Sequence, residues 1–323
     1  MTRRTDLSFR PLTLQDTPAW SALIHALAAA DGTGETYEPD DLAEELVQAG
    51  ADASADTCGV WDGRTLVAYG QVHVSTARTA EGLARAHLGG GVHPRWRGRG
   101  IATALFERME ARALRTAGRR HPGAAVQLSA SGGVDGADAR AFLAGRGYAP
   151  ARWFTDMARP LPGPPLGPAL GPAGGRVEPY EDTMAEELRL AHNDAFSTHW
   201  GSTARSPEVW ADLVGARSAR TDLWRVVREP GGRILAYCSV SQWREGALYV
   251  DRVGTRQEAR GRGLARAVLL GTVAAAAADG AWTTMELTVD AANPTRADAL
   301  YRSVGFVPVR TQAAFTHTVP PGA

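Results

Sequence analysis

Two short phrases rich in glycine and arginine carry the strongest chemical signal in this sequence of 323 residues. RGRGIA occupies 97–102 and RGRGLA occupies 260–265. Each follows a run typical of a strand and precedes a run typical of a helix. At such a turn, free backbone N–H groups meet the positive end of the helix dipole, and glycine lets the backbone approach an anion closely. Each phrase therefore predicts a phosphate-binding loop.

Neither phrase matches the common nucleotide-binding loops. The string G-x-x-x-x-G-K-[ST] does not occur, and G-x-G-x-x-G fails because its third glycine would fall at Thr103 or Arg266. A basic turn without a ligand, or an RGG-like nucleic-acid segment, would explain one isolated copy. Two copies in the same strand-to-helix setting favour a ligand site.

The composition indicates a soluble globular protein with no general attraction to polyanions. Hydrophobic residues make up 44% and charged residues 22%, and 35 basic side chains balance 35 acidic ones. We therefore expect no nucleic-acid partner and no membrane partner. Cys58 and Cys238 each lie in a strand-like run, which favours core thiols in a reducing compartment. The first residues lack the apolar run of a signal peptide, and no window approaches the roughly 18 apolar residues of a membrane span, so we expect a cytoplasmic protein.

The chain reads as two halves with the same order of elements. Residues 160–175, PLPGPPLGPALGPAGG, are typical of a linker. On either side come a strand, helices, an antiparallel meander, the glycine phrase, a helix, a strand, a short helix and a last strand. We predict an N-terminal domain at 1–159, a linker at 160–175 and a C-terminal domain at 176–323. The fold class is α/β, with a mixed, mostly antiparallel sheet flanked by helices in each domain.

Both halves resemble the GNAT superfamily of acyl-CoA-dependent N-acyltransferases. The family signature [QR]-x-x-G-x-[GA] appears as RWRGRG from Arg95 and as EARGRG from Glu258, where Glu replaces the first residue. A second signature, N-x-x-x-A-x-x-x-Y-x-x-x-G-[FY], is matched by NPTRADALYRSVGF at 293–306. The tandem arrangement and the stretch AHNDAFSTHWG at 191–201 are similar to the mycothiol synthase group of actinobacterial acetyltransferases.

The resemblance implies acetyl-CoA as cosubstrate, a small-molecule amine as acceptor, no metal, and a monomer or homodimer. His192 and His199 lack a third ligand at a suitable spacing, so a metal site is not expected. The implied cofactor-binding residues are Val253, Gly254, Thr255, Arg260, Gly261, Arg262, Gly263, Leu264, Ala265 and Asn293 in the second half, and Val92, Arg97, Gly98, Arg99, Gly100, Ile101 and Ala102 in the first.

The second half is the expected catalytic half. In the family, a Tyr in the second signature protonates the departing thiolate, and Tyr301 occupies that place. Alignment of GRGY with SVGF sets Leu143 against Tyr301 and Asp135 against Asn293. Since leucine donates no proton, we expect the first half to be structural or to bind CoA only.

The general base is not fixed by the sequence. The family position falls on residues that are not bases: Ala84, Ala86, Ala247 and Tyr249. Asp251 shares a strand face with position 249 and is our catalytic candidate, acting through a water molecule. A salt bridge from Asp251 to Arg252 or Arg256 is the alternative.

The acceptor side is expected between the first helices of the second half. Asp194, His199 and Tyr249 are the candidate substrate contacts. The rival hypothesis is a non-catalytic acyl-CoA-binding sensor or scaffold, which the missing strand glutamate favours and the intact segment 293–306 opposes. The acceptor and the acyl chain length stay open.

Overall fold

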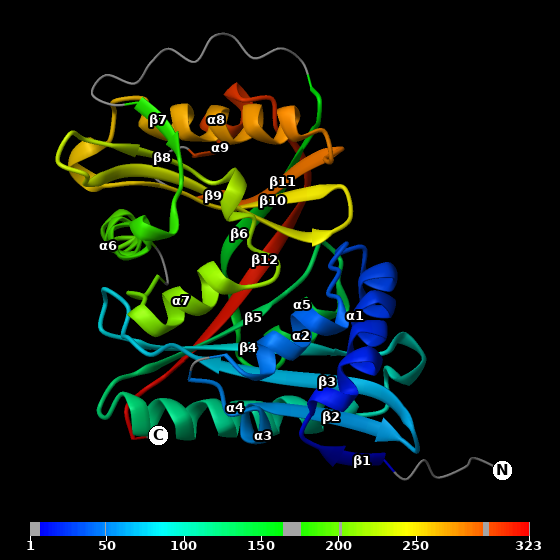
Figure 1. Cartoon of the computed structure of the whole chain (residues 1–323). Helices are drawn as coiled ribbons and strands as arrows, with labels where there is room; N and C mark the ends of the chain where they lie inside the picture. Colours follow the sequence, from blue (N-terminus) through cyan, green and yellow to red (C-terminus); the bar gives the residue numbers. More distant parts are fainter. Residues whose placement is uncertain (1–6, 49, 164–175, 200–201, 293–296, 323) are drawn as a thin grey trace. The chain divides into compact units, whose positions relative to one another are not determined.

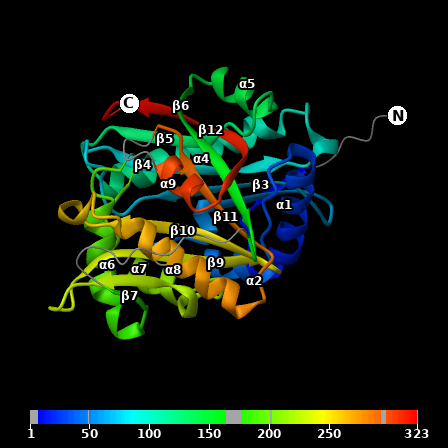
Figure 2. The same ribbon diagram turned by 90° about the horizontal axis from the view of Figure 1, so that it is seen from above.

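The structure is a computed structural model that describes residues 7–48, 50–163, 176–199, 202–292 and 297–322. The chain forms two compact units (Figures 1 and 2). The N-terminal unit comprises residues 1–152 and 312–323, and the C-terminal unit comprises residues 153–311. Most of the predicted linker, and Asn293, lie outside the described residues.

The N-terminal unit is built on a mixed sheet with strand order β1-β2-β3-β4-β5-β12. Neighbouring strands are antiparallel except for β4 and β5, which run parallel. Its elements are β1 (Leu7–Arg10), α1 (Thr17–Asp31), α2 (Pro39–Leu46), α3 (Ala53–Asp56), β2 (Thr57–Asp62), β3 (Thr65–Val74), β4 (Ala84–Val92), α4 (Ile101–Arg120), β5 (Val126–Ser131), α5 (Asp138–Ala144) and the end of β12 (Val307–Val319).

Helices α1 and α4 cover opposite faces of this sheet. A Cβ at Gly70 would collide with Met109 of α4, whereas a Cβ at Gly91 would collide with Leu27 of α1. Gly70 follows Tyr69 on β3, and Tyr69 pairs with Gly91 on β4, so Tyr69 and Gly91 share the α1 face. Glycine at these two places therefore lets both helices pack close to the strands.

The C-terminal unit repeats the plan with strand order β6-β11-β10-β9-β8-β7, in which β10 and β11 are the parallel pair. Its elements are β6 (Ala149–Pro160, from Trp153), β7 (Arg176–Pro179), α6 (Ala185–Ala195), α7 (Pro207–Gly215), β8 (Arg225–Arg228), β9 (Ile234–Arg244), β10 (Ala247–Thr255), α8 (Leu264–Asp279), β11 (Thr284–Asp290), α9 (Ala297–Ser303) and the start of β12.

The last strand of each sheet comes from the other half of the sequence. In the N-terminal unit, Ala314–Val319 of β12 pair antiparallel with Val126–Ser131 of β5. In the C-terminal unit, Phe154–Pro160 of β6 pair antiparallel with Thr284–Asp290 of β11. The sequence-based domain bounds assign each of these strands to the half of the chain in which it lies. In the structure, each strand belongs mainly to the compact unit formed by the other half.

The predicted class and element order are confirmed. Each unit is a mixed, mostly antiparallel sheet flanked by helices. The hairpin turn at Gly63 has a left-handed φ of 60°, and α8 ends on Gly280 at a φ of 75°, as the glycine stop predicts. Cys58 and Cys238 are both free thiols. Within the described ranges, no helix is long and apolar enough to cross a membrane.

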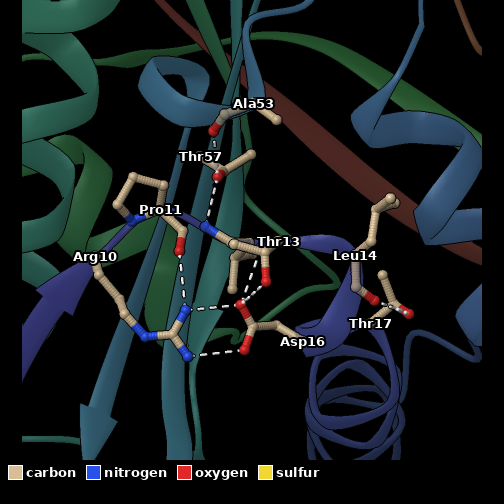
Figure 3. Close-up of polar contacts among 9 residues, drawn as sticks. Arg10, Pro11, Thr13, Leu14, Asp16, Thr17, Ala53 and Thr57 are labelled. Atoms are coloured by element: carbon tan, nitrogen blue, oxygen red, sulfur yellow. Dashed lines mark hydrogen bonds and ion pairs between the residues drawn. The ribbon is translucent and has the colours of Figure 1, made fainter.

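A polar network fixes the entry to α1 (Figure 3). The Asp16 carboxylate accepts hydrogen bonds from Arg10 at 2.7 and 2.8 Å and from the backbone and hydroxyl of Thr13 at 2.9 and 2.7 Å. The Thr57 hydroxyl donates to the Ala53 carbonyl and accepts from the backbone N–H of Leu12. The bond with Arg10 lowers the pKa of Asp16 to about 2. The network ties β1 to the first turn of the helix.

Asp16→Asn should lower the free energy of unfolding by about 2 kcal/mol at pH 7. The folded-state pKa lies below the unfolded value near 4, so this stabilisation is present above about pH 4 and is lost as the pH falls towards 2. Urea unfolding at pH 7 and at pH 3 measures it, with Asp40→Asn, an exposed carboxylate of α2, as control. An equal effect of both variants at pH 7 would show that the network is not stabilising.

Candidate functional site

The two glycine phrases form the same backbone structure. Gly98 and Gly100 have φ angles of 74° and 77°, and Gly261 and Gly263 have 75° and 74°. Gly100 is the N-cap of α4 and Gly263 is the N-cap of α8. A Cβ at any of the four would have no heavy atom within 4 Å, so the loops face open space. Both loops therefore present helix N-termini that can receive a phosphate.

The arginines of the phrases help to hold the loops in place. Arg97 donates to Asp31 at 2.6 Å and to the Val92 carbonyl at 3.1 Å. Arg260 donates to the Ala195 carbonyl at 2.8 Å. These bonds join the loops to the C-terminal ends of α1 and α6 and to the end of β4. A bound phosphate would then meet backbone N–H groups first, with the guanidinium groups at the rim.

In each unit the parallel pairing stops where the site is expected. The last pair of β4 and β5 is Leu88 with Ala130, and the last pair of β10 and β11 is Tyr249 with Glu286. Beyond these pairs, β4 and β10 run on to the glycine loops, still paired on their other side. Residues 89–92 and 250–255 therefore have, among the described residues, a strand partner on one side only. These unpaired edges include the predicted cofactor contacts Val92, Val253, Gly254 and Thr255.

Asp251 stands at a bulge in β10. The register with β9 shifts between Val250 and Arg252, and the Ser241 hydroxyl donates to Asp251 at 2.8 Å. Ser241 is paired with Tyr249 across the two strands, so their side chains lie on the same face of the sheet. Because the Ser241 hydroxyl also reaches Asp251, Asp251 lies on that face too. Burial raises the pKa of Asp251 to about 6, although Arg252 and Ser241 act against this. A carboxylate with that pKa is suited to accept a proton near neutral pH.

The alternative salt bridge from Asp251 to Arg256 does not form. Arg256 instead donates to Glu187 at 2.7 Å and to the Ile234 carbonyl at 2.7 Å. Arg252 affects Asp251 electrostatically, but among the described residues no ion pair joins the two.

Tyr301 lies on α9 in an environment that keeps it protonated. Burial raises the pKa of the Tyr301 phenol, and nearby Cys238 and Tyr249 raise it further. Its ring packs edge-on against Phe306, with 6.1 Å between centroids. Burial also raises the pKa of Tyr249. In the C-terminal unit, Tyr249 therefore lies close enough to Asp251 and to Tyr301 to interact electrostatically with each of them.

The expected acceptor contacts have other partners as well. Asp194 accepts from the backbone N–H of Gln257 at 3.0 Å, which ties α6 to the turn before the glycine loop. His199 follows the end of α6, and its ring lies 5.6 Å from that of Phe196. A buried hydrogen bond of 2.6 Å joins His192 Nδ1 to the Tyr237 hydroxyl, and no sequence motif indicates it. Burial lowers the pKa of His192 to about 3, so its imidazole is neutral.

The N-terminal unit holds a cavity of about 760 Å³ beside its glycine loop. Gly98, Gly100, Ile101 and Ala102 line it, together with Leu143, which is 2% exposed. The cavity is also lined by four polar residues that the sequence analysis did not single out: Tyr69, Gln71, His73 and His87. The first three stand at every second position of AYGQVHV, and that alternation is the signal that could have found them.

A mixed sheet whose parallel pair ends early beside a glycine-capped helix defines the class of acyl-CoA-dependent transferases. The sequence model of the acetyltransferase (GNAT) family matches residues 20–129 and 185–306, and the chain belongs to this family, with the fold present twice in tandem. Enzymes of this family use acetyl-CoA.

Solved structures support the tandem fold. A GCN5-related N-acetyltransferase from Sphaerobacter thermophilus is 26% identical with a TM-score of 0.75, and the match covers 98% of this chain and 97% of that one. A tandem GNAT protein from the clavulanic acid biosynthesis pathway is 19% identical with a TM-score of 0.69, over 98% of this chain and 100% of that one. Saccharomyces cerevisiae N-myristoyltransferase with bound myristoyl-CoA is 14% identical with a TM-score of 0.65, over 99% and 81%. No curated protein shows significant sequence similarity to the chain.

Gly263→Val should weaken CoA binding to the C-terminal unit at least tenfold. A β-branched residue resists a φ of 74° and would displace the N–H groups that we expect to receive the pyrophosphate. Gly280→Val is the matched control, because it imposes the same strain at the other end of α8 with equal free space. Calorimetric titration with CoA measures both variants, and equal affinities would contradict the assignment of the loop.

Asp251→Asn should raise the free energy of unfolding at pH 7.5 by about 1–3 kcal/mol. The folded-state pKa of about 6 lies above the unfolded value near 4, so ionisation costs stability increasingly as the pH rises between those values. The gain should therefore shrink at pH 4.5. Urea unfolding at both pH values tests this, with Asp279→Asn, an exposed carboxylate at the end of α8, as control. A loss of stability at pH 7.5 would mean that Asp251 is a structural anchor.

Proposed function

We propose that the chain is an acetyl-CoA-dependent N-acetyltransferase that acts on the primary amine of a small molecule, with the chemistry in the C-terminal unit. The observation that carries the proposal is a group of three side chains on β10 and α9, in which Tyr249 interacts electrostatically both with Asp251, whose pKa is raised to about 6, and with the protonated phenol of Tyr301. Asp251 and Tyr249 lie on β10 where its parallel pairing with β11 ends. Acyl transfer needs a proton acceptor and a proton donor at one such place.

Each step of the reaction has a group in this unit. Asp251 takes a proton from the acceptor ammonium, directly or through a water molecule, and the free amine attacks the thioester carbonyl. A backbone N–H near Val253, on the unpaired edge of β10, donates to the developing oxyanion. When the C–S bond breaks, the Tyr301 hydroxyl passes its proton to the departing sulfur, and the proton that the attacking nitrogen loses returns to the phenolate through solvent. The transfer from Tyr301 is uphill, because a thiol with an unperturbed pKa near 8.5 is a stronger acid than a phenol with an unperturbed pKa near 10.

The expected cosubstrate contacts fit this arrangement. Gly261 and Gly263 present the N-terminus of α8 to the pyrophosphate, and the edge at Val253, Gly254 and Thr255 offers backbone groups to the pantetheine arm. Arg260 and Arg262 flank the loop, and Leu264 and Ala265 begin the helix. Membership of the mycothiol synthase group stays a prediction, and with it the amino-sugar type of acceptor.

The rival function is a non-catalytic acyl-CoA sensor or scaffold. Such a protein would bind CoA through the same loops but would release no thiol from acetyl-CoA with any amine. The raised pKa of Asp251 favours the enzyme, because a carboxylate kept in a buried place at a cost in stability is typical of an active site.

Tyr301→Phe should lower the turnover number at least about a hundredfold while CoA affinity is kept, because the ring remains and only the proton donor is lost. Tyr180→Phe is the matched control. Tyr180 is a buried tyrosine of the same unit that packs on Trp224 at 5.2 Å, and its hydroxyl has no hydrogen-bond partner among the described residues. Single-turnover thiol release measures the chemical step. Retention of most of the turnover by Tyr301→Phe would remove the reason for assigning catalysis to this unit.

A further inference from the structure

The cavity of the N-terminal unit passes through its sheet. Phe106 and Leu105 of α4 line it on one face, and Trp20 and Leu27 of α1 line it on the other. The two faces connect where the pairing of β4 with β5 ends, after Leu88. The volume of about 760 Å³ is within the range of small-molecule sites.

Three consecutive glycines lie at this passage, and the first of them borders open space. Beyond Leu88, β4 continues as Gly89, Gly90 and Gly91. Gly90 has a φ of 145°, and a Cβ there would collide with the Tyr69 carbonyl, so glycine is required. Gly89 is different, because its backbone is not in the left-handed region and a Cβ there would meet only Gln71, at 3.9 Å. No neighbouring backbone lies close to Gly89, and the space beside it is part of the cavity.

The two ends of the cavity have opposite electrostatic character. At one end, Gly98 and Gly100 present the N-terminus of α4, which attracts anions. On the α1–α2 side, Glu35 and Glu45 line the cavity, and both raise the pKa of Tyr69. The α1–α2 side is therefore suited to a cation.

Glu45 is the carboxylate that most needs a ligand. Its side chain is hydrogen-bonded to Gln71, and burial raises its pKa. Of the other carboxylates that line the cavity, Asp31 and Asp56 are joined to Arg97 and Arg112, and Glu35 and Asp138 are exposed. Glu45 is less exposed and has no ion pair among the residues that the structure describes. A buried carboxylate without a cation is costly, and a charged ligand would remove that cost.

His87 adds no positive charge to the cavity, and Arg97, which also lines it, is paired with Asp31. His87 lines it on β4, and burial together with nearby Arg85 and His73 lowers the pKa of His87 to about 4. Its imidazole is thus neutral near pH 7, lying 3.4 Å from the Ser129 hydroxyl. A neutral imidazole and an amide oxygen are both hydrogen-bond acceptors for an ammonium group.

We propose that the N-terminal unit holds a second ligand site, in which Glu45 and Gln71 bind the ammonium group of an amine on the α1–α2 side of the passage. The site binds and does not transfer an acyl group, because Leu143, which the alignment of the two halves sets against Tyr301, cannot donate a proton to the thiolate. This site does not depend on the chemistry proposed for the C-terminal unit.

Calorimetric titration of the full chain with spermidine at pH 8, with CoA present, tests the site. Glu45→Gln removes one charge and keeps the shape, so it should weaken one binding event by about 10- to 100-fold. Glu44→Gln is the matched control, since it removes the same charge one residue earlier on α2 and does not line the cavity. Equal affinity of Glu45→Gln and the parent, or no saturable binding of spermidine to the parent, would overturn the proposal.

A second pair of variants locates the binding event. Gly89→Leu places a side chain beside Gln71 and should abolish the event, whereas Gly89→Ala adds only a methyl group where 3.9 Å is free and should keep it. Thermal melting confirms that both variants fold. Parental affinity in Gly89→Leu would place the amine elsewhere and overturn the proposal. This experiment measures spermidine binding, whereas the proposed function is tested by the thiol release of Tyr301→Phe. Either proposal can therefore fail without the other.

Discussion

Both units depend on a parallel strand pair that ends early. Parallel pairing of β4 with β5 stops at Leu88, and that of β10 with β11 stops at Tyr249. Each continuing strand leads directly into a helix capped by glycine, so its unpaired backbone edge and the helix N-terminus face the same space. Buried backbone groups need partners, and here a ligand can supply them. The same feature creates an anion site and a route through the sheet.

The two units use that space differently because equivalent tyrosines have different neighbours. Tyr69 pairs with Gly91, and Tyr237 pairs with Gly254, at matching places in the two sheets. Tyr237 is hydrogen-bonded to His192 of α6 and is fully buried. Tyr69 packs on Trp20 of α1 at 5.5 Å and lines the cavity. In the C-terminal unit, the tyrosine is therefore held by a hydrogen bond to helix α6. In the N-terminal unit, the equivalent tyrosine has an aromatic contact with helix α1 and borders a cavity.

The sequence predicted those features that depend on local chain chemistry. Glycines with left-handed φ at 98, 100, 261 and 263 follow from the need for a tight turn before a helix, and the stop of α8 at Gly280 follows from the same rule. It could not predict the exchange of terminal strands. GRGYAP and SVGFVP both lead from a glycine turn into a strand, and nothing in either strand states which sheet it joins, because strand pairing is set by contacts distant in sequence.

The chemical groups show the same limit. Tyr301 is predicted because its motif is local, and Asp251 because it follows Tyr249 at a spacing of two. The raised pKa of Asp251 depends on burial, which no motif encodes. Glu45 is harder still, since it lies on α2 while its partner Gln71 lies on β3, and only packing brings them together. A search limited to the family motifs therefore finds the glycine loops in both units but does not find Glu45, which lines the cavity of the N-terminal unit.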